Sequence, residues 1–452
     1  MAGQRRWLSG RKDVACDLAA SSIRFGAGVT AEIGMDLKEL KARNVVVFTD
    51  PHLRDLPVVH TVLDSLADNG IRAHVFDQVR VEPNDISFQR AIAYMNELAV
   101  SVDAIVAVGG GSVIDTAKIA NLYSMFPPDD FYDYVNPPVG KGIPVPGALR
   151  PLFAIPTTAG TGSETTGVAI FDDTHTKSKT GVAHRRLKPT LGIVDPLNTA
   201  TLPPNVAKYS GFDVLCHAIE SFTALPFTER PYPASPNHRP AYQGSNPISD
   251  IWSLHALHQT NKFLRRAVND VSDVEARSAM LLASTAAGIG FGNAGVHLCH
   301  GMSYPIASQV SSDNGAVFKL TGVWYKYDQM TEKAKAEGAG DILADEVLRL
   351  MQDLDVPLAV ASVTISELTV VTPVNTVDFP DHSLEYEMLR LGSTILTRGK
   401  VMAPLVQVVP VDPFDIIKPS ALAAPLDGCP ALTIANDTST TTSSSYRLAM
   451  VA

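Results

Sequence analysis

An aspartate and a histidine four positions apart, Asp213 and His217, are the side chains in this sequence best suited to chemistry. They lie in the stretch 211–221 (GFDVLCHAIES), which has the composition of a helix. A spacing of four places both side chains on one helical face, one turn apart. A carboxylate and an imidazole on one face can chelate a divalent cation such as iron or zinc. Surface pairs that hold no metal have the same spacing, so the interpretation depends on partners elsewhere.

A second histidine-containing stretch, 293–305 (NAGVHLCHGMSYP), supplies such partners. His297 and His300 lie three positions apart, and by spacing either could complete a metal site with Asp213 and His217. A single histidine in an apolar stretch is more often a core residue. Here two stretches with ligand spacing follow a predicted nucleotide-binding region in the chain, and this combination favours a metal site.

Three glycines and a serine, Gly109–Ser112, follow a buried apolar run at 104–108 and precede a helical pattern from Val113. Glycines let the backbone approach a ligand closely, and a helix N-terminus presents free N–H groups to phosphate. The loop is therefore a candidate cradle for a dinucleotide pyrophosphate, with Asp115 in the first helical turn. An ordinary tight turn would have the same composition, and the loop does not match GxGxxG.

Three further features fall near the same predicted sheet edge. Asp50 ends an early strand, where a carboxylate can bind ribose hydroxyls and disfavour a 2′-phosphate, which favours NAD over NADP. The alternative is that Asp50 caps the turn at Pro51. The loop 156–164 (PTTAGTGSE) offers hydroxyls and backbone N–H groups. Lys179 could reach a ribose or a phosphate, or lie in solvent.

Strand and helix patterns alternate between about residues 21 and 202, with glycines at strand ends. This alternation predicts a parallel α/β sheet, whose ligands bind at the carboxyl ends of the strands. The predicted strands are 44–49, 71–76, 104–108, 152–155, 168–171 and 191–194, and the predicted helices are 57–70, 87–99 and 113–123.

The character of the chain changes after about residue 203. Residues 203–370 are mainly helical, with a proline-rich loop at 225–246. Residues 371–452 mix β-branched runs, prolines and a Thr/Ser tract, which predicts a disordered or loosely packed tail. The helices are predicted at 206–223, 247–267, 273–290 and 328–353.

Composition excludes several function classes. The 452 residues carry a net charge of −10 and no long Lys/Arg run, so we expect no nucleic-acid partner. No apolar run reaches the roughly 18–20 residues that span a bilayer, so we expect no membrane partner. The four cysteines are scattered, which is typical of a reducing compartment. Residues 1–20, whose first dozen residues carry four basic groups and no acid, fit a short transit segment or a solvated N-terminus.

Four segments together carry a resemblance to a known family. In chain order they are GGGSVIDTAK (109–118), PTTAGTGSE (156–164), GFDVLCHAIES (211–221) and NAGVHLCHGMSYP (293–305). Over about residues 20–310 the sequence resembles the iron-containing (group III) alcohol dehydrogenases. The resemblance implies an α/β N-terminal Rossmann-like NAD domain and an all-α C-terminal metal-binding domain, a dehydroquinate synthase-like architecture. It implies an active site in the cleft between them.

The resemblance also implies roles for individual residues. Asp213, His217 and His300 would be metal ligands and would form the catalytic group, with His297 as a neighbour. Tyr304 takes a position where many members have a histidine near the substrate. The implied NAD contacts are Asp50, Gly110, Gly111, Ser112, Asp115, Thr157, Thr158, Thr161 and Lys179.

A narrower resemblance, carried by 162–172, 240–252 and 299–305, is to a mitochondrial transhydrogenase branch of this family. It implies metal-assisted hydride transfer with bound NAD, from a hydroxy acid (4-hydroxybutyrate) to an oxo acid (2-oxoglutarate) as small-molecule partners. The alternatives are a plain NAD-dependent alcohol dehydrogenase, a catalytically impaired isoform, or a metal-dependent lyase of the dehydroquinate synthase type. Self-association into a homo-oligomer stays open.

The sequence departs from the family in the segment that would carry the fourth metal ligand, where His297 or Asp313 could substitute, and the tail beyond about residue 370 does not match the family. The family's fourth metal ligand is a histidine in a Pro-His-Gly setting downstream of the third, and this chain has no histidine from 301 to 381. The segment that would carry it, near 310–315, is missing relative to the family. A site with three protein ligands still binds a metal, usually more weakly and with an additional water.

Overall fold

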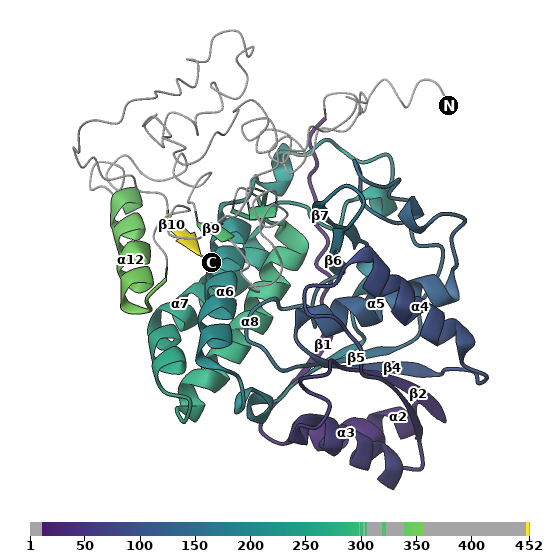
Figure 1. The fold of residues 1–452 in the computed structure, drawn as a ribbon. Helices are drawn as coiled ribbons and strands as arrows, with labels where there is room; N and C mark the ends of the chain where they lie inside the picture. The colour runs from purple at the N-terminus through teal and green to yellow at the C-terminus, as the bar shows by residue number, and fades with distance from the viewer. Residues whose placement is uncertain are drawn as a thin grey trace, which may run out of the picture. The chain divides into compact units, whose positions relative to one another are not determined.

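The computed structural model describes residues 11–297, 299–301, 303–304, 319–321, 339–356 and 449–451 (Figure 1). The chain divides into two compact units, residues 1–296 and 297–452. The predicted tail at 371–452, apart from its strand near the C-terminus, lies outside the described residues, as does the segment at 310–315. The predicted boundary between residues 202 and 203 stays a prediction, since the first unit contains both the sheet and the first helices after it.

A six-stranded parallel sheet forms the base of the first unit, in the order β1-β8-β5-β4-β2-β3 (Figure 1). Its strands are short apolar runs, as the sequence predicted, and β1 is an addition that the sequence analysis did not foresee. The strands are β1 (Ser22–Phe25), β2 (Asn44–Phe48), β3 (Arg72–Phe76), β4 (Ala104–Gly109), β5 (Leu152–Pro156) and β8 (Leu191–Val194).

Helices cover both faces of this sheet because successive strand residues point to opposite sides. In β2, Val45 and Val47 pack with α2 and α3, while Val46 and Phe48 pack with α4 and α5. Both strand faces are therefore buried, which is the arrangement typical of parallel sheets. The helices are α2 (Ile33–Glu39), α3 (Pro57–Asp68), α4 (Asp85–Glu97) and α5 (Gly111–Met125).

The predicted strand at 168–171 lies outside the parallel sheet. It forms β6 (Val168–Asp173), which pairs with β7 (Ser178–Ala183) in a separate antiparallel sheet, and Asp172 of β6 also makes an isolated bridge to Asn84. A four-residue turn joins β6 to β7, so local pairing outcompetes insertion into the larger sheet. The residue pattern at 168–171 does not distinguish a strand of a hairpin from a strand of the parallel sheet.

Three long helices, α6 (Pro204–Thr223), α7 (Pro247–Asn269) and α8 (Val274–Ala294), pack against one another after the sheet. The structure confirms all three predicted helices. α8 runs four residues past its predicted end at 290, with Gly288, Gly290 and Gly292 inside it, and its C-cap is Gly295, whose φ is +97°. No helix of the described residues is both long and apolar enough to cross a membrane.

In the second unit, the described elements are β9 (Lys319–Thr321), α12 (Ala339–Asp353) and β10 (Ala449–Val451). β9 pairs with β10 antiparallel. α12 confirms the C-terminal half of the helix predicted at 328–353, and residues 328–338 lie outside the described part of the chain.

Candidate metal centre and cofactor loops

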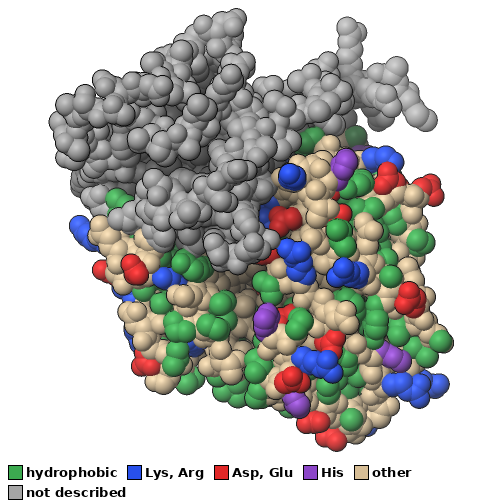
Figure 2. Space-filling view, viewed as in Figure 1, with side chains coloured by type: hydrophobic (Ala, Val, Ile, Leu, Met, Phe, Trp, Pro, Cys, Tyr) green, Lys and Arg blue, Asp and Glu red, His purple; other side chains and the backbone are tan. Residues whose placement is uncertain are grey.

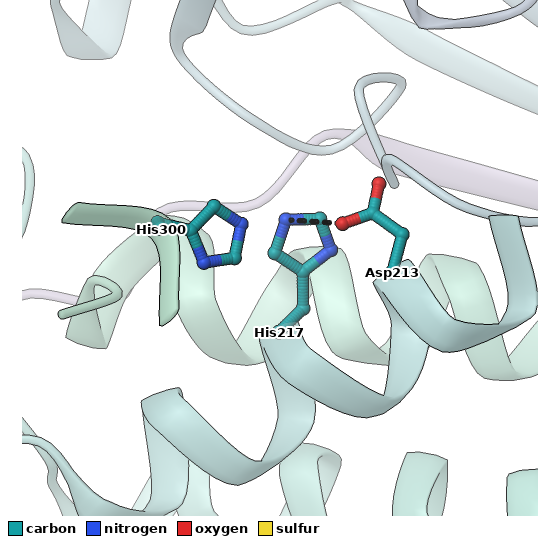
Figure 3. Close-up of side chains that lie close together, drawn as sticks. All are labelled: Asp213, His217 and His300. Carbon is teal, nitrogen blue, oxygen red and sulfur yellow. Dashed lines mark ion pairs between the residues drawn. The ribbon is translucent and has the colours of Figure 1, made fainter. Parts of the chain in front are cut away.

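Asp213 and His217 lie on one face of α6, and His300 lies beside them (Figure 3). Each of the three side chains offers one ligand atom, and these atoms all lie within 4.8 Å of one another. His217 and His300 are buried, and the Asp213 side chain is 13% exposed. A carboxylate and two imidazoles form a donor set that suits iron or zinc. This group could hold a divalent metal ion.

The Asp213–His217 separation fits two ligands of one ion better than a hydrogen-bonded ion pair. His217 Nε2 lies 3.4 Å from Asp213 Oδ1. A charge-assisted hydrogen bond between such groups would be about 2.7–2.9 Å long. Two ligand atoms that are each 2.0–2.1 Å from a tetrahedral ion lie about 3.4 Å apart. The separation of the two side chains is compatible with two ligands of one ion.

The orientation of the His217 ring is set by an aromatic neighbour on α8. The ring stacks on Phe291, with centroids 3.9 Å apart and planes 8° apart. The stack covers one face of the imidazole and leaves its edge, where the ring nitrogens lie, directed toward Asp213 and His300 (Figure 3). Sequence analysis did not foresee the role of Phe291.

The other residues of the second histidine stretch fall around this group. His297 is buried, and its carbonyl accepts a hydrogen bond of 2.7 Å from the Gly301 N–H, but it does not belong to the three-residue group. Tyr304 contacts His300 edge to face, with ring centroids 6.4 Å apart. Of the two histidines that spacing left open, the structure brings His300 to Asp213 and His217.

The two predicted cofactor loops lie against each other at the carboxyl ends of β4 and β5. Gly109 is paired with Pro156, and the Thr157 N–H donates to the Gly109 carbonyl at 3.2 Å. A Cβ on Gly110 would lie 3.1 Å from Thr158, and one on Gly111 would lie 2.5 Å from Thr161. Larger residues would therefore push the loops apart. Gly110, Gly111, Thr158 and Thr161 form one surface at the start of α5.

Asp50 follows β2 at the same edge, and its carboxylate is engaged within its own turn. Oδ1 accepts hydrogen bonds from the N–H groups of His52, at 2.8 Å, and Leu53, at 3.2 Å. The cap that sequence analysis weighed as the alternative is thus present. A role in binding ribose stays a prediction.

Asp115 is held inside the protein. Its Oδ1 accepts from Ser163 Oγ at 2.5 Å, and its Oδ2 accepts from the Ile170 N–H at 3.0 Å. Lys118, one turn further along α5, is fully buried and donates to Ser163 Oγ and to the Val168 carbonyl, both at 2.7 Å. Burial lowers the pKa of Lys118 below its ordinary value. Asp115 and Lys118 therefore tie α5 to the second loop and to β6.

Lys179 on β7 is paired with two carboxylates. Its Nζ lies 2.8 Å from Glu82 Oε2 and 3.0 Å from Asp172 Oδ1, and its side chain is 9% exposed. Burial disfavours its charge, but attraction to Glu82 and Asp172 outweighs burial and raises its pKa. Lys179 is thus a fixed cation near the first loop, because the Glu82 N–H donates to Ser112 Oγ at 3.1 Å.

α8 also contacts the second cofactor loop. Gly162, at φ +58°, packs on Gly288, and a Cβ on either glycine would clash with the backbone of the other. Thr285 Oγ1 donates to Glu164 Oε1 at 2.8 Å, and burial raises the pKa of Glu164. Since α8 carries Phe291 as well, the same helix supports the loop and the His217 ring.

Sequence analysis missed Glu82, Lys118, Glu164, Thr285 and Phe291. The sequence contains a signal for one of them, Lys118. Asp115 and Lys118 lie three positions apart on a predicted helix, which is the spacing of an intrahelical ion pair. The other contacts join residues far apart in the chain and leave no local pattern.

The protein is an α/β protein with a candidate metal centre. Its parallel sheet is covered by helices on both faces and has glycine and threonine loops at the carboxyl ends of its strands. The Asp/His group follows the sheet in the chain. Family comparisons agree with this class. Residues 20–196 match the iron-containing alcohol dehydrogenase model, and residues 241–369 match the C-terminal model of the Fe-containing alcohol dehydrogenase family. The chain belongs to the iron-containing alcohol dehydrogenase family.

Individual relatives carry a narrower name. A Bos taurus protein named mitochondrial hydroxyacid-oxoacid transhydrogenase is 52% identical over 386 residues, which cover 78% of this chain and 82% of that protein. The Homo sapiens protein of the same name is 51% identical over the same shares of both chains. A Dictyostelium discoideum protein, named as a probable mitochondrial enzyme of this kind, is 47% identical over 78% of this chain and 72% of its own.

Solved structures share the fold. A sulfoacetaldehyde reductase from Bifidobacterium kashiwanohense in complex with NAD+ has a TM-score of 0.56 and 28% identity, over 65% of this chain and 72% of that chain. A 1,3-propanediol oxidoreductase has a TM-score of 0.59 and 23% identity, over 85% and 86% of the two chains. The second supports the fold alone.

Proposed function

We propose that this chain is a hydroxyacid-oxoacid transhydrogenase. The overall reaction would transfer a hydride from a hydroxy acid such as 4-hydroxybutyrate to an oxo acid such as 2-oxoglutarate, and NAD, when bound, would supply the hydride-carrying chemistry. The products are succinate semialdehyde and 2-hydroxyglutarate. The names and identities of the relatives support this activity, and their names support a mitochondrial location.

The observation that carries the proposal is the spacing of Asp213, His217 and His300. Their ligand atoms lie within 4.8 Å of one another, and two of them are 3.4 Å apart, as ligands of one ion are. Bound there, iron or zinc would supply a Lewis acid for the substrate hydroxyl. Three protein ligands leave a coordination position open, as in catalytic rather than structural sites. The sequence has no histidine between 301 and 381 that could take the place of the family's fourth ligand.

The chain's own residues would bind and orient the reactants. Gly110 and Gly111 let the backbone approach a pyrophosphate, and the N-terminus of α5 offers it N–H groups. Thr158 and Thr161 would line the same surface. The fixed ammonium of Lys179 would donate a hydrogen bond to the cofactor. Phe291 would hold the His217 ring so that no reorientation is needed when the metal and the substrate bind.

A plain NAD-dependent alcohol dehydrogenase is the second candidate, favoured by the family match and by likeness to a reductase solved with NAD+. The two activities differ in their need for free cofactor. A transhydrogenase keeps its reduced cofactor and turns over with a hydroxy acid and an oxo acid together, without added NAD. A dehydrogenase requires added NAD and one substrate.

The test combines metal analysis with this assay on the full chain. After loading with iron or zinc, we expect about one ion per chain and turnover that requires both acids. A matched Asp213→Asn variant should lose most of its metal and its activity while keeping its fold. Less than about a tenth of an ion per wild-type chain, with NAD still bound, would exclude metal-assisted catalysis. That result would indicate a catalytically impaired isoform.

A further inference from the structure

Glu82 connects two of the residues predicted to contact NAD. Its carboxylate lies 2.8 Å from the ammonium of Lys179 on β7. Its backbone N–H donates to the hydroxyl of Ser112, in the first turn of α5, at 3.1 Å. One residue thus touches both the glycine loop and the lysine of the hairpin, although Glu82 and Lys179 are 97 positions apart.

The backbone of Glu82 is in a conformation that side chains disfavour. Its φ is +54°, in the left-handed region. Non-glycine residues in that region cost of order 1 kcal/mol or more and persist where surrounding contacts impose them. Glycine would adopt this φ without strain, so a glycine variant at position 82 can separate the backbone conformation from the carboxylate.

The residues that follow Glu82 dock the hairpin as well. The Asp172 N–H donates to the Pro83 carbonyl at 2.8 Å, and the Thr174 N–H donates to Asp85 Oδ1 at 3.0 Å. These bonds hold the backbone of the hairpin, but they do not involve the Lys179 side chain. The Glu82 carboxylate restricts that side chain from outside the hairpin, whereas Asp172 is its cross-strand neighbour within it.

The ammonium of Lys179 retains a donor for a ligand. An ammonium group has three N–H donors. Within the described part of the chain, its acceptors are the carboxylates of Glu82 and Asp172. Two acceptors at fixed positions orient the remaining N–H, and they keep a 9%-exposed cation charged. A neutral partner at position 82 would remove one of the two negative charges that hold the ammonium.

We propose that Glu82 is a positioning residue for the dinucleotide: it holds the Lys179 ammonium at a fixed place relative to Ser112, so that the lysine and the glycine loop act on the same cofactor. This inference rests on the proposed NAD site. Glu82 acts through Lys179 and not by direct contact with the reacting atoms.

The test is a double-mutant cycle on NAD binding, measured by calorimetry on the full metal-loaded chain. Glu82→Gln should weaken NAD binding about tenfold, the loss expected when a hydrogen bond to a charged group is misplaced. Lys179→Met should weaken it by a similar factor or more. In the Lys179→Met background, Glu82→Gln should change the Kd by less than about twofold, because the lysine through which Glu82 acts is gone.

Two further variants separate the effect of the Glu82 carboxylate from the effect of its left-handed backbone conformation. Glu82→Gly relieves the left-handed strain, so it should keep or raise the Tm while losing NAD affinity as Glu82→Gln does. Lys41→Gly, at an exposed left-handed position with φ +58°, is the matched control and should leave NAD binding unchanged.

Two outcomes overturn the inference while leaving the proposed function intact. One is a Glu82→Gln variant that binds NAD as tightly as the wild type. The other is additivity of the Glu82→Gln and Lys179→Met losses, which would mean independent roles. A wild-type chain that does not bind NAD would instead overturn the proposed cofactor site, and this inference with it.

Discussion

The imidazole of His217 lies flat on the ring of Phe291, with centroids 3.9 Å apart and planes 8° apart. The contact joins α6, which carries Asp213 and His217, to α8. Because α8 also packs on Gly162 of the second cofactor loop, one helix contacts both halves of the proposed site.

Replacing Phe291 should weaken metal binding without removing a ligand. In Phe291→Leu, the His217 ring loses the surface that fixes its orientation, so we expect metal affinity to fall about tenfold, as for other residues that orient metal ligands. Chelator competition would measure the change. Phe263→Leu on α7, also a buried phenylalanine, is the control. Equal metal affinity in the two variants would contradict the role of the stack.

The two histidines of the second stretch should behave differently. His300→Ala removes a member of the three-residue group, and we expect metal affinity to fall more than about a hundredfold. His297→Ala should keep its metal, since His297 is outside the group. Elemental analysis after dialysis would distinguish them. The hypothesis fails if His297→Ala is the variant that loses the ion.

The glycine contact between α8 and the second loop should be intolerant of a methyl group. A Cβ on Gly288 would lie 2.7 Å from the Gly162 carbonyl oxygen, so Gly288→Ala should destabilise the fold by about 1–3 kcal/mol. Gly292→Ala, one turn further, has its nearest neighbour 3.4 Å away and should be neutral or stabilising by up to about 1 kcal/mol. Urea unfolding of both variants gives the comparison. Similar free energies of unfolding would refute the close packing.

Lys188 should make stability depend on pH in the alkaline range. Burial, with smaller contributions from Lys118 and Arg185, lowers the pKa of Lys188 to about 8 in the folded state. An unfolded chain would titrate this lysine near its ordinary value of about 10.4. Between these values the unfolded state binds more protons, so the free energy of unfolding should rise as pH increases from about 8 to 10.

Lys188→Met provides the reference for this measurement, because all other titrating groups are shared. The wild type should gain stability relative to the variant between pH 8 and pH 10 in urea unfolding. A constant difference across that range would show that burial does not shift the Lys188 pKa.

Local patterns were enough to predict much of the fold. Apolar runs of strand length, separated by helical periods and ending in glycines, predicted the parallel sheet and the start of α5. The same periods predicted α6, α7 and α8. These signals are readable because backbone geometry imposes a fixed repeat on neighbouring residues. The sequence also placed Asp213 and His217 together, since a helix brings residues four apart onto one face.

Contacts between distant segments required the tertiary structure. Packing decided that β6 pairs with β7 outside the main sheet, that His300 and not His297 lies beside Asp213 and His217, and that Phe291 stacks on the His217 ring. It also brought Glu82 to Lys179. Such contacts have no period along the chain, because they depend on how whole helices and loops pack. The sequence by itself determined the family, the principal helices and most strands of the parallel sheet, and the candidate ligand pair, whereas only the tertiary structure decided which distant side chains complete and orient the site.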